Sequence, residues 1–228
     1  MRRDAVSGTL LIAGALASLL VMSLHPTAHG LMNAESAERL ARLNVLVHGL
    51  ALVSVPVLFL GLLGFSRRLG PTSLTAAALV AYGFGCAAVM SAAVASGFVA
   101  TEVIRLLITA DSSSRELYHG LLRYTGLLNQ GFAKVHLVAT SAAILLWSAA
   151  ILKTRRASRG AGVAGIVIGV GILAAFFSGL LRLDVHGFGI MIFAQSCWLI
   201  WVGILMFRGE ERGAGSLSPT GLTGIPGG

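Results

Sequence analysis

Three histidines of this chain begin long apolar stretches in the same way. His48, His136 and His186 each follow a valine at the start of such a stretch, and His25 ends the first one. Neutral imidazole is a common ligand of zinc, copper and haem iron. Three imidazoles from three helices would leave open the fourth position of a catalytic zinc site or a copper site. We therefore predict a metal site at His48, His136 and His186, with His25 as its fourth member.

The same histidines suit a second cofactor. Two imidazoles on facing helices are enough to hold a six-coordinate haem b, and His48 and His136 are the best candidates because each lies inside an apolar stretch. An ionisable residue within a membrane span is costly and usually faces the bundle interior. The competing interpretation is that both histidines only form hydrogen bonds to neighbouring helices.

Amide and carboxylate side chains near the histidines are expected to fix their tautomers, as the outer partners of metal ligands do. Asn44 lies four residues before His48 and therefore on the same helical face. The expected partners are Asn44 for His48, Asn129 for His136, and Asp184 or Glu102 for His186. No catalytic residue is predicted.

The composition shows which kind of fold must position these residues. Of 228 residues, 56% are hydrophobic and 11% are charged, against about 25% charged in soluble domains. Mean hydropathy is +0.85. These values exclude a soluble enzyme, a disordered protein and a nucleic-acid-binding module. The net charge of +8 reflects basic residues that flank membrane spans, and the first partner of the chain is the lipid bilayer.

The hydropathy pattern predicts an all-α, polytopic integral membrane protein of six transmembrane helices. A spanning helix needs about 20 apolar residues. The predicted spans are about 7–24, 44–65, 74–101, 132–152, 162–181 and 187–207. They would form one domain, 1–208, arranged as three hairpins, and we expect the first span to be retained rather than cleaved as a signal peptide.

Lys and Arg residues predict the orientation. Most of the 17 basic residues fall in the tails and short loops on one side, including the pairs Arg67-Arg68 and Arg155-Arg156. Such clusters mark the cytoplasmic side. We therefore expect both termini in the cytoplasm, a location in the bacterial cytoplasmic (inner) membrane, and a disordered cytoplasmic tail over residues 209–228, which are rich in Gly, Ser, Thr and Pro.

Two segments on the outer side are predicted to be helical. Asn33 is expected to cap a helix that begins at Ala34 and runs into the second span. The segment 105–130 carries leucines at helical spacing after a capping box at Ser113 and Glu116. We expect it to form an amphipathic helix on the outer membrane surface or over the mouth of the bundle.

Other polar and small residues have a structural interpretation. Gln195 is the most polar deep residue and is expected to form interhelical hydrogen bonds. Gly83-Phe84-Gly85 lacks the strand-turn-helix context of a nucleotide site and predicts close helix packing. Cys86 and Cys197 lie in apolar stretches without metal-binding or redox spacing. A phosphate-binding loop, a nucleophile elbow and an HExxH motif are all missing from the sequence.

Three functions remain open from the sequence. The first is a histidine-lined haem b or transition-metal site near the extracytoplasmic face, for redox chemistry or metal handling, which would imply a membrane or periplasmic redox partner. The second is a cofactor-free transporter or lipid-handling protein for a neutral or apolar substrate. The third is a structural or assembly subunit of a membrane complex. Self-association into a homo-oligomer is compatible with each.

Overall fold

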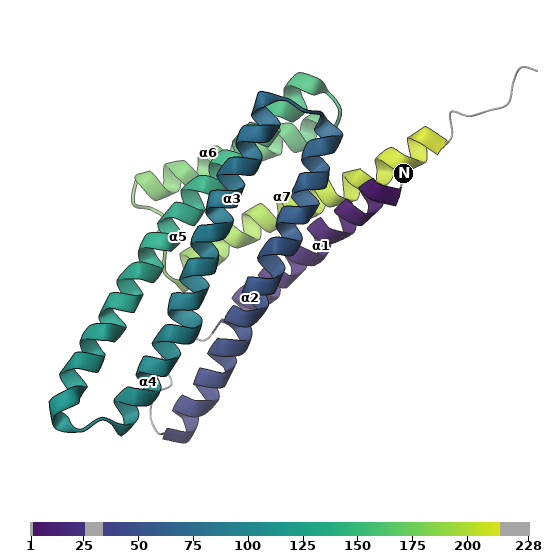
Figure 1. Ribbon diagram of the computed structural model, residues 1–228. Helices are drawn as coiled ribbons and strands as arrows, with labels where there is room; N and C mark the ends of the chain where they lie inside the picture. The colour runs from purple at the N-terminus through teal and green to yellow at the C-terminus, as the bar shows by residue number, and fades with distance from the viewer. Residues whose placement is uncertain (1, 26–33, 215–228) are drawn as a thin grey trace, which may run out of the picture.

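The computed structural model describes residues 2–25 and 34–214, and all regular elements of these residues are helices (Figure 1). The helices are α1 Arg2–Ser23, α2 Ala34–Leu69, α3 Ser73–Ala93, the π-helix η1 Val94–Val99, α4 Ala100–Thr109, α5 Ser112–Thr154, α6 Arg159–Phe177 and α7 Val185–Ala214. They provide six stretches long and apolar enough to cross a membrane, with α3, η1 and α4 forming one of them. The predicted all-α, six-span fold is confirmed, and the protein is an integral membrane protein.

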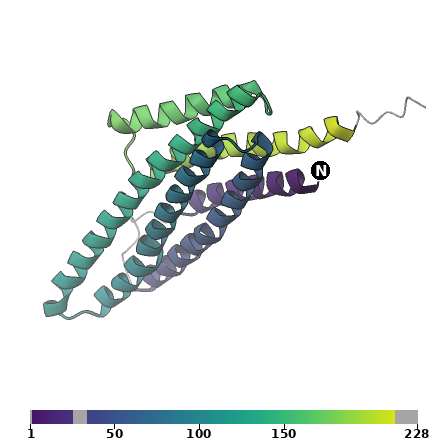
Figure 2. The same cartoon turned by 45° about the horizontal axis from the view of Figure 1, so that its top comes forward.

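The helices form two groups that are inclined to each other (Figure 2). One group contains α2, the α3–η1–α4 span and α5. The other contains α1, α6 and α7. Helix α1 joins the groups because it packs against both α2 and α7, while α6 packs on α5.

The third predicted hairpin differs from the first two. The pairs α1–α2 and α3–α5 pack along each other, as expected of hairpins. Helices α6 and α7 share few contacts, and their main neighbours are α5 and α1 respectively. Lipid tails are as apolar as the helix surfaces, so helix pairing in a membrane depends on close shape complementarity rather than on chain order.

The larger of the two buried apolar clusters in the described residues contains none of the histidines. Trp147, Trp198 and Phe65 are buried there, each at least eleven residues after the last histidine of its helix. The indole nitrogen of Trp147 donates to the Ser66 hydroxyl at 2.8 Å, and that of Trp198 donates to the Ala161 carbonyl at 2.9 Å. Both indoles therefore bury a large apolar area with their one donor satisfied.

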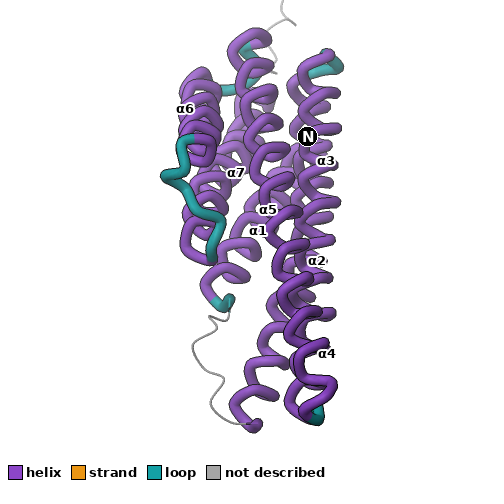
Figure 3. Tube along the Cα trace, turned by 90° about the vertical axis from the view of Figure 1, so that its left-hand side faces the viewer, coloured by secondary structure: helices purple, strands orange, loops and turns teal. Residues whose placement is uncertain are grey.

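Helix α5 is much longer than a bilayer requires. Its 43 residues correspond to about 64 Å at 1.5 Å per residue, roughly twice the hydrocarbon thickness. The segment 105–130, expected to form an amphipathic helix on the outer side, is divided in the structure: residues 105–109 end α4, and residues 112–130 are the beginning of the continuous helix α5, which no proline interrupts. Helices α2, α4 and α5 continue past the ends of α1 and α7 as a three-helix extension (Figure 3).

Asp111, rather than Ser113, caps α5. Its carboxylate accepts the Ser114 backbone N–H at 2.8 Å and the Ser113 hydroxyl at 2.8 Å. These hydrogen bonds lower the pKa of Asp111, and the bond from the Ser114 backbone has the largest effect. On the same extension, Arg105 pairs with Glu38 at 3.1 Å and links α4 to α2.

The described part of the chain ends within the segment that was expected to form the tail. Helix α7 continues to Ala214, beyond Gly209, where the disordered tail was expected to begin. Glu210, Glu211 and Arg212 are good helix formers, so the helix can propagate past the apolar segment. Residues 215–228 and Asn33, the expected cap of α2, lie outside the described residues, whereas α2 begins at Ala34 as predicted.

Candidate functional site

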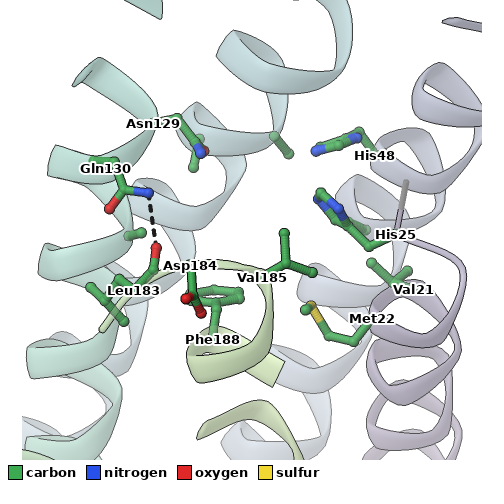
Figure 4. Close-up of a pocket in the computed structure, with 14 residues that line it drawn as sticks. Val21, Met22, His25, His48, Asn129, Gln130, Leu183, Asp184, Val185 and Phe188 are labelled. Atoms are coloured by element: carbon green, nitrogen blue, oxygen red, sulfur yellow. Dashed lines mark hydrogen bonds between the residues drawn. The ribbon is translucent and has the colours of Figure 1, made fainter. Parts of the chain in front are cut away.

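A cavity of about 280 Å³ lies where α1 ends and α7 begins, against α2, α3 and α5 (Figure 4). We call it the histidine cavity, because His25 and His48 form part of its wall. Most of its lining is apolar. The apolar residues include Val21, Met22, Ala93, Ala133, Val185 and Phe188. A cavity of this kind suits a ligand whose body is a hydrocarbon or an aromatic ring.

Polar groups occupy two facing walls of the histidine cavity. His25 and His48 lie together on one wall, with ring centroids 5.1 Å apart in an edge-on arrangement. Asn129 and Gln130 of α5 face them across the gap, and Asp184 lies at the start of α7 (Figure 4). The cavity therefore offers an apolar interior and hydrogen-bonding groups on opposite sides.

His48 is fixed by its own helix. Its Nδ1 lies 2.8 Å from the Asn44 carbonyl oxygen, one turn earlier in α2. A carbonyl oxygen can only accept, so Nδ1 carries the proton and Nε2 of the neutral ring is an acceptor. The backbone carbonyl of Asn44, and not the side-chain amide that was expected, thus contacts the imidazole.

The Asn44 side chain instead joins α2 to the π-helix. Its amide nitrogen donates to the Ser96 carbonyl at 2.9 Å and to the Thr101 hydroxyl at 2.9 Å. A π-helix disturbs the regular backbone pairing of an α-helix and occurs often at functional sites. Within it, Gly97 packs directly against His48, and a Cβ there would overlap the Cβ of that histidine. The π-helix and its glycine therefore create the space in which His48 lies.

His136 is held at a different place. It is 6% exposed, and its Nδ1 lies 2.9 Å from the Gly85 carbonyl oxygen of α3. The same reasoning places the proton on Nδ1 and leaves Nε2 as an acceptor. This Nε2 is buried and finds no hydrogen-bond partner among residues 2–25 and 34–214. The predicted partner, Asn129, lines the histidine cavity and does not orient the imidazole.

His186 does not share the histidine cavity. It is exposed and lies in a neighbouring open groove of about 480 Å³, which His25 also lines. Its two expected partners have other roles. The Asp184 carboxylate accepts the Gly187 backbone N–H at 2.8 Å and so caps α7, and Glu102 pairs with Arg105 at 3.5 Å.

The described residues do not assemble the four-histidine metal site. Among residues 2–25 and 34–214, no group of three or more His, Cys, Asp or Glu side chains is placed to hold a metal ion. The structure joins His25 and His48 in one wall, buries His136 against Gly85 and leaves His186 in the groove. Spacing along the chain could not show this, because it does not define which helices are neighbours.

The turn that leads into α7 is tied to α5. Gln130 donates its side-chain N–H to the Leu183 carbonyl at 2.8 Å (Figure 4). Phe188, in the first turn of α7, lines the histidine cavity and also packs on His136, with ring centroids 5.8 Å apart. Phe188 thus contacts both the cavity and the buried imidazole.

Sequence reasoning missed four residues of this arrangement: Gly97, Gln130, Phe188 and, as a hydrogen-bond acceptor, Gly85. Only the glycines left a signal, since small residues allow close approach of helices in lipid. The close packing predicted at Gly83-Phe84-Gly85 is confirmed at Gly85, where a Cβ would lie 2.7 Å from the Thr140 methyl group. Nothing in the sequence distinguished Phe188 from other apolar residues.

Comparison of the chain with known protein families, curated proteins and solved structures finds no match. The site must therefore be interpreted from its own geometry.

Proposed function

We propose that this protein binds a neutral, lipid-soluble amphiphile whose small head group carries a hydroxyl. The observation that supports the proposal is the histidine cavity, which combines apolar walls with an imidazole acceptor, Nε2 of His48. In the orientation predicted from the basic residues, the cavity lies in the extracytoplasmic half of the membrane. A lipid-handling or transport role follows more directly from this arrangement than cofactor chemistry.

The lining residues favour a neutral head group. Among the lining residues that the structure describes, Asp184 is the one with a formal charge, and its carboxylate already accepts a backbone N–H of α7. None of the described residues that line the cavity is Lys or Arg, so they offer no counter-ion to an anionic head group. A hydroxyl can donate to His48 and accept from the amides of Asn129 or Gln130 on the facing wall.

A haem b or metal function receives less support. Of the predicted metal residues, His25 and His48 form a pair with rings 5.1 Å apart, and a third ligand is not placed beside them in the described residues. Analysis of iron, copper and zinc in the purified protein tests this alternative directly. Stoichiometric metal that His48→Ala removes would overturn the amphiphile proposal in favour of a metal site.

A cavity-filling variant tests the proposal. Ala51 of α2 lines the histidine cavity, whereas Val53, two residues later, is 65% exposed. Ala51→Phe should occupy the cavity, and Val53→Phe should add the same ring to the lipid-facing surface. The probe is a decyl-substituted p-hydroquinone, whose binding to the purified protein in detergent is measured by calorimetry.

We expect the wild type and Val53→Phe to bind the probe with similar affinity and Ala51→Phe to bind it at least tenfold more weakly. Size-exclusion profiles and melting temperatures verify that both variants are folded. Equal affinity in Ala51→Phe and Val53→Phe, or no binding by the wild type, would show that the cavity is not the site.

A further inference from the structure

The unpartnered nitrogen of His136 is the feature that the proposed function leaves unused. An acceptor buried without a partner costs free energy, so such groups are rare and usually have a role. His136 is 6% exposed, and in the described part of the chain only its Nδ1 forms a hydrogen bond, to the Gly85 carbonyl. Its Nε2 is therefore available to a donor that the described residues do not supply.

The position of His136 connects it to the histidine cavity. Asn129, Ala133 and His136 follow at helical spacing on one face of α5, and the first two line the cavity. Phe188 of α7 lines the cavity as well and packs on the His136 ring. A rotation of the Phe188 side chain would extend the cavity along α5 to His136.

The surroundings of Phe188 permit such a movement. Phe188 lies in the first turn of α7, directly after the irregular segment 178–184. The hydrogen bond from Gln130 to the Leu183 carbonyl ties this segment to α5. A single neutral hydrogen bond of this kind is a weak restraint, which the binding of a ligand can offset.

We propose that His136 is the inner acceptor of the same site, covered by Phe188 in the empty cavity, and that the ligand carries two hydroxyl donors. This inference rests on the proposed function. One hydroxyl would donate to Nε2 of His48 and the other to Nε2 of His136, since both imidazoles hold their proton on Nδ1 against a backbone carbonyl. The ligand class is a dihydroxy amphiphile such as a hydroquinone, and no chemical step is implied.

The test compares two probes that differ by one donor. The decyl p-hydroquinone has two hydroxyl groups, and its monomethyl ether has one. We expect the wild type to bind the hydroquinone about fivefold more tightly, since one hydrogen bond contributes about 1 kcal/mol. A wild-type ratio of one would overturn the inference while leaving the cavity function intact.

Substitution of His136 separates a ligand-binding role from a structural one. In His136→Asn the side-chain amide can still donate to the Gly85 carbonyl in place of Nδ1, whereas the Nε2 acceptor is lost. The expected result is that the preference for the hydroquinone disappears and the ether still binds. An unchanged preference would show that His136 only holds α5 against α3.

Phe188→Ala provides an independent test that does not alter a histidine. Removing the ring should expose His136 to the cavity and raise the preference for the hydroquinone above the wild-type ratio. A ratio that does not rise would overturn the proposed gate. Ala51→Phe separates the failure of this inference from the failure of the proposed function. If Ala51→Phe binds neither probe, the cavity is supported as the binding site, even when the His136 variant behaves as wild type.

Discussion

Gly97 offers the sharpest test of how the structure positions His48. A Cβ at this residue would overlap the Cβ of His48, and would lie 2.5 Å from its Cγ and 3.1 Å from its Nδ1. Ordinary contacts between carbon atoms are about 3.5–4.0 Å. The imidazole cannot turn away without losing the bond from its Nδ1 to the Asn44 carbonyl. Gly97→Ala must therefore push α2 and the π-helix apart.

The expected cost follows from a matched control in α3. Among the residues that the structure describes, a Cβ at Gly83 would meet only Phe59, at 3.7 Å, so Gly83→Ala introduces no overlap. Each substitution gains up to about 1 kcal/mol of helix propensity, and this gain cancels in the comparison. Overpacking a buried contact costs about 1–3 kcal/mol. Gly97→Ala should thus be about 1–3 kcal/mol less stable than Gly83→Ala.

Thermal unfolding of the two variants in the same detergent measures this difference. For a chain of this size, a difference of 1 kcal/mol corresponds to about 2–4 °C in Tm. We also expect Gly97→Ala to bind the decyl p-hydroquinone more weakly than Gly83→Ala, because the His48 acceptor is displaced. Equal Tm values for the two variants would refute the close contact between Gly97 and His48 and the positioning role assigned to the π-helix.

Two further predictions concern the core that supports the site. Gly165→Ala should destabilise the protein by about 1–3 kcal/mol relative to Gly171→Ala. A Cβ at Gly165 would lie 2.7 Å from the Trp198 indole nitrogen, whereas a Cβ at Gly171 would meet no described atom within 4 Å. Equal melting temperatures of the two variants would contradict this packing. Trp147→Phe should lower the free energy of unfolding by about 1–3 kcal/mol, since it leaves the buried Ser66 hydroxyl without the indole donor. If adding Ser66→Ala to this variant restores stability, the lost hydrogen bond is the cause.

The sequence predicted some residues of the site but not the groups that hold them in place. The cavity contains His25, His48, Asn129 and Asp184, four of the eight residues predicted to form or support a site. The prediction supposed that side chains hold His48 and His136, whereas the structure places the backbone carbonyls of Asn44 and Gly85 against the two imidazoles. Every residue carries a carbonyl, so the sequence gives no sign of which one accepts a bond from an imidazole.

The deep polar residue Gln195 illustrates a prediction that needed no tertiary detail. Its amide donates to the Thr140 hydroxyl at 3.1 Å, which confirms the expected interhelical bond. In a bilayer there is no water to satisfy a buried amide, so a neighbouring helix must supply the partner. The sequence predicts that such a bond exists, but not which residue forms it.

The sequence by itself determined the helical, six-span architecture, since a bilayer forces backbone groups to pair within each apolar segment. It also determined that histidines gather toward one end of several spans. Only the tertiary structure decided that α6 packs on α5 and α7 on α1, that His48 fits beside Gly97, and that His136 bonds to Gly85, 51 residues away. These outcomes depend on how closely two helices can approach, where a difference of a few tenths of an ångström matters. The spacing of residues along the chain does not encode which helices are adjacent.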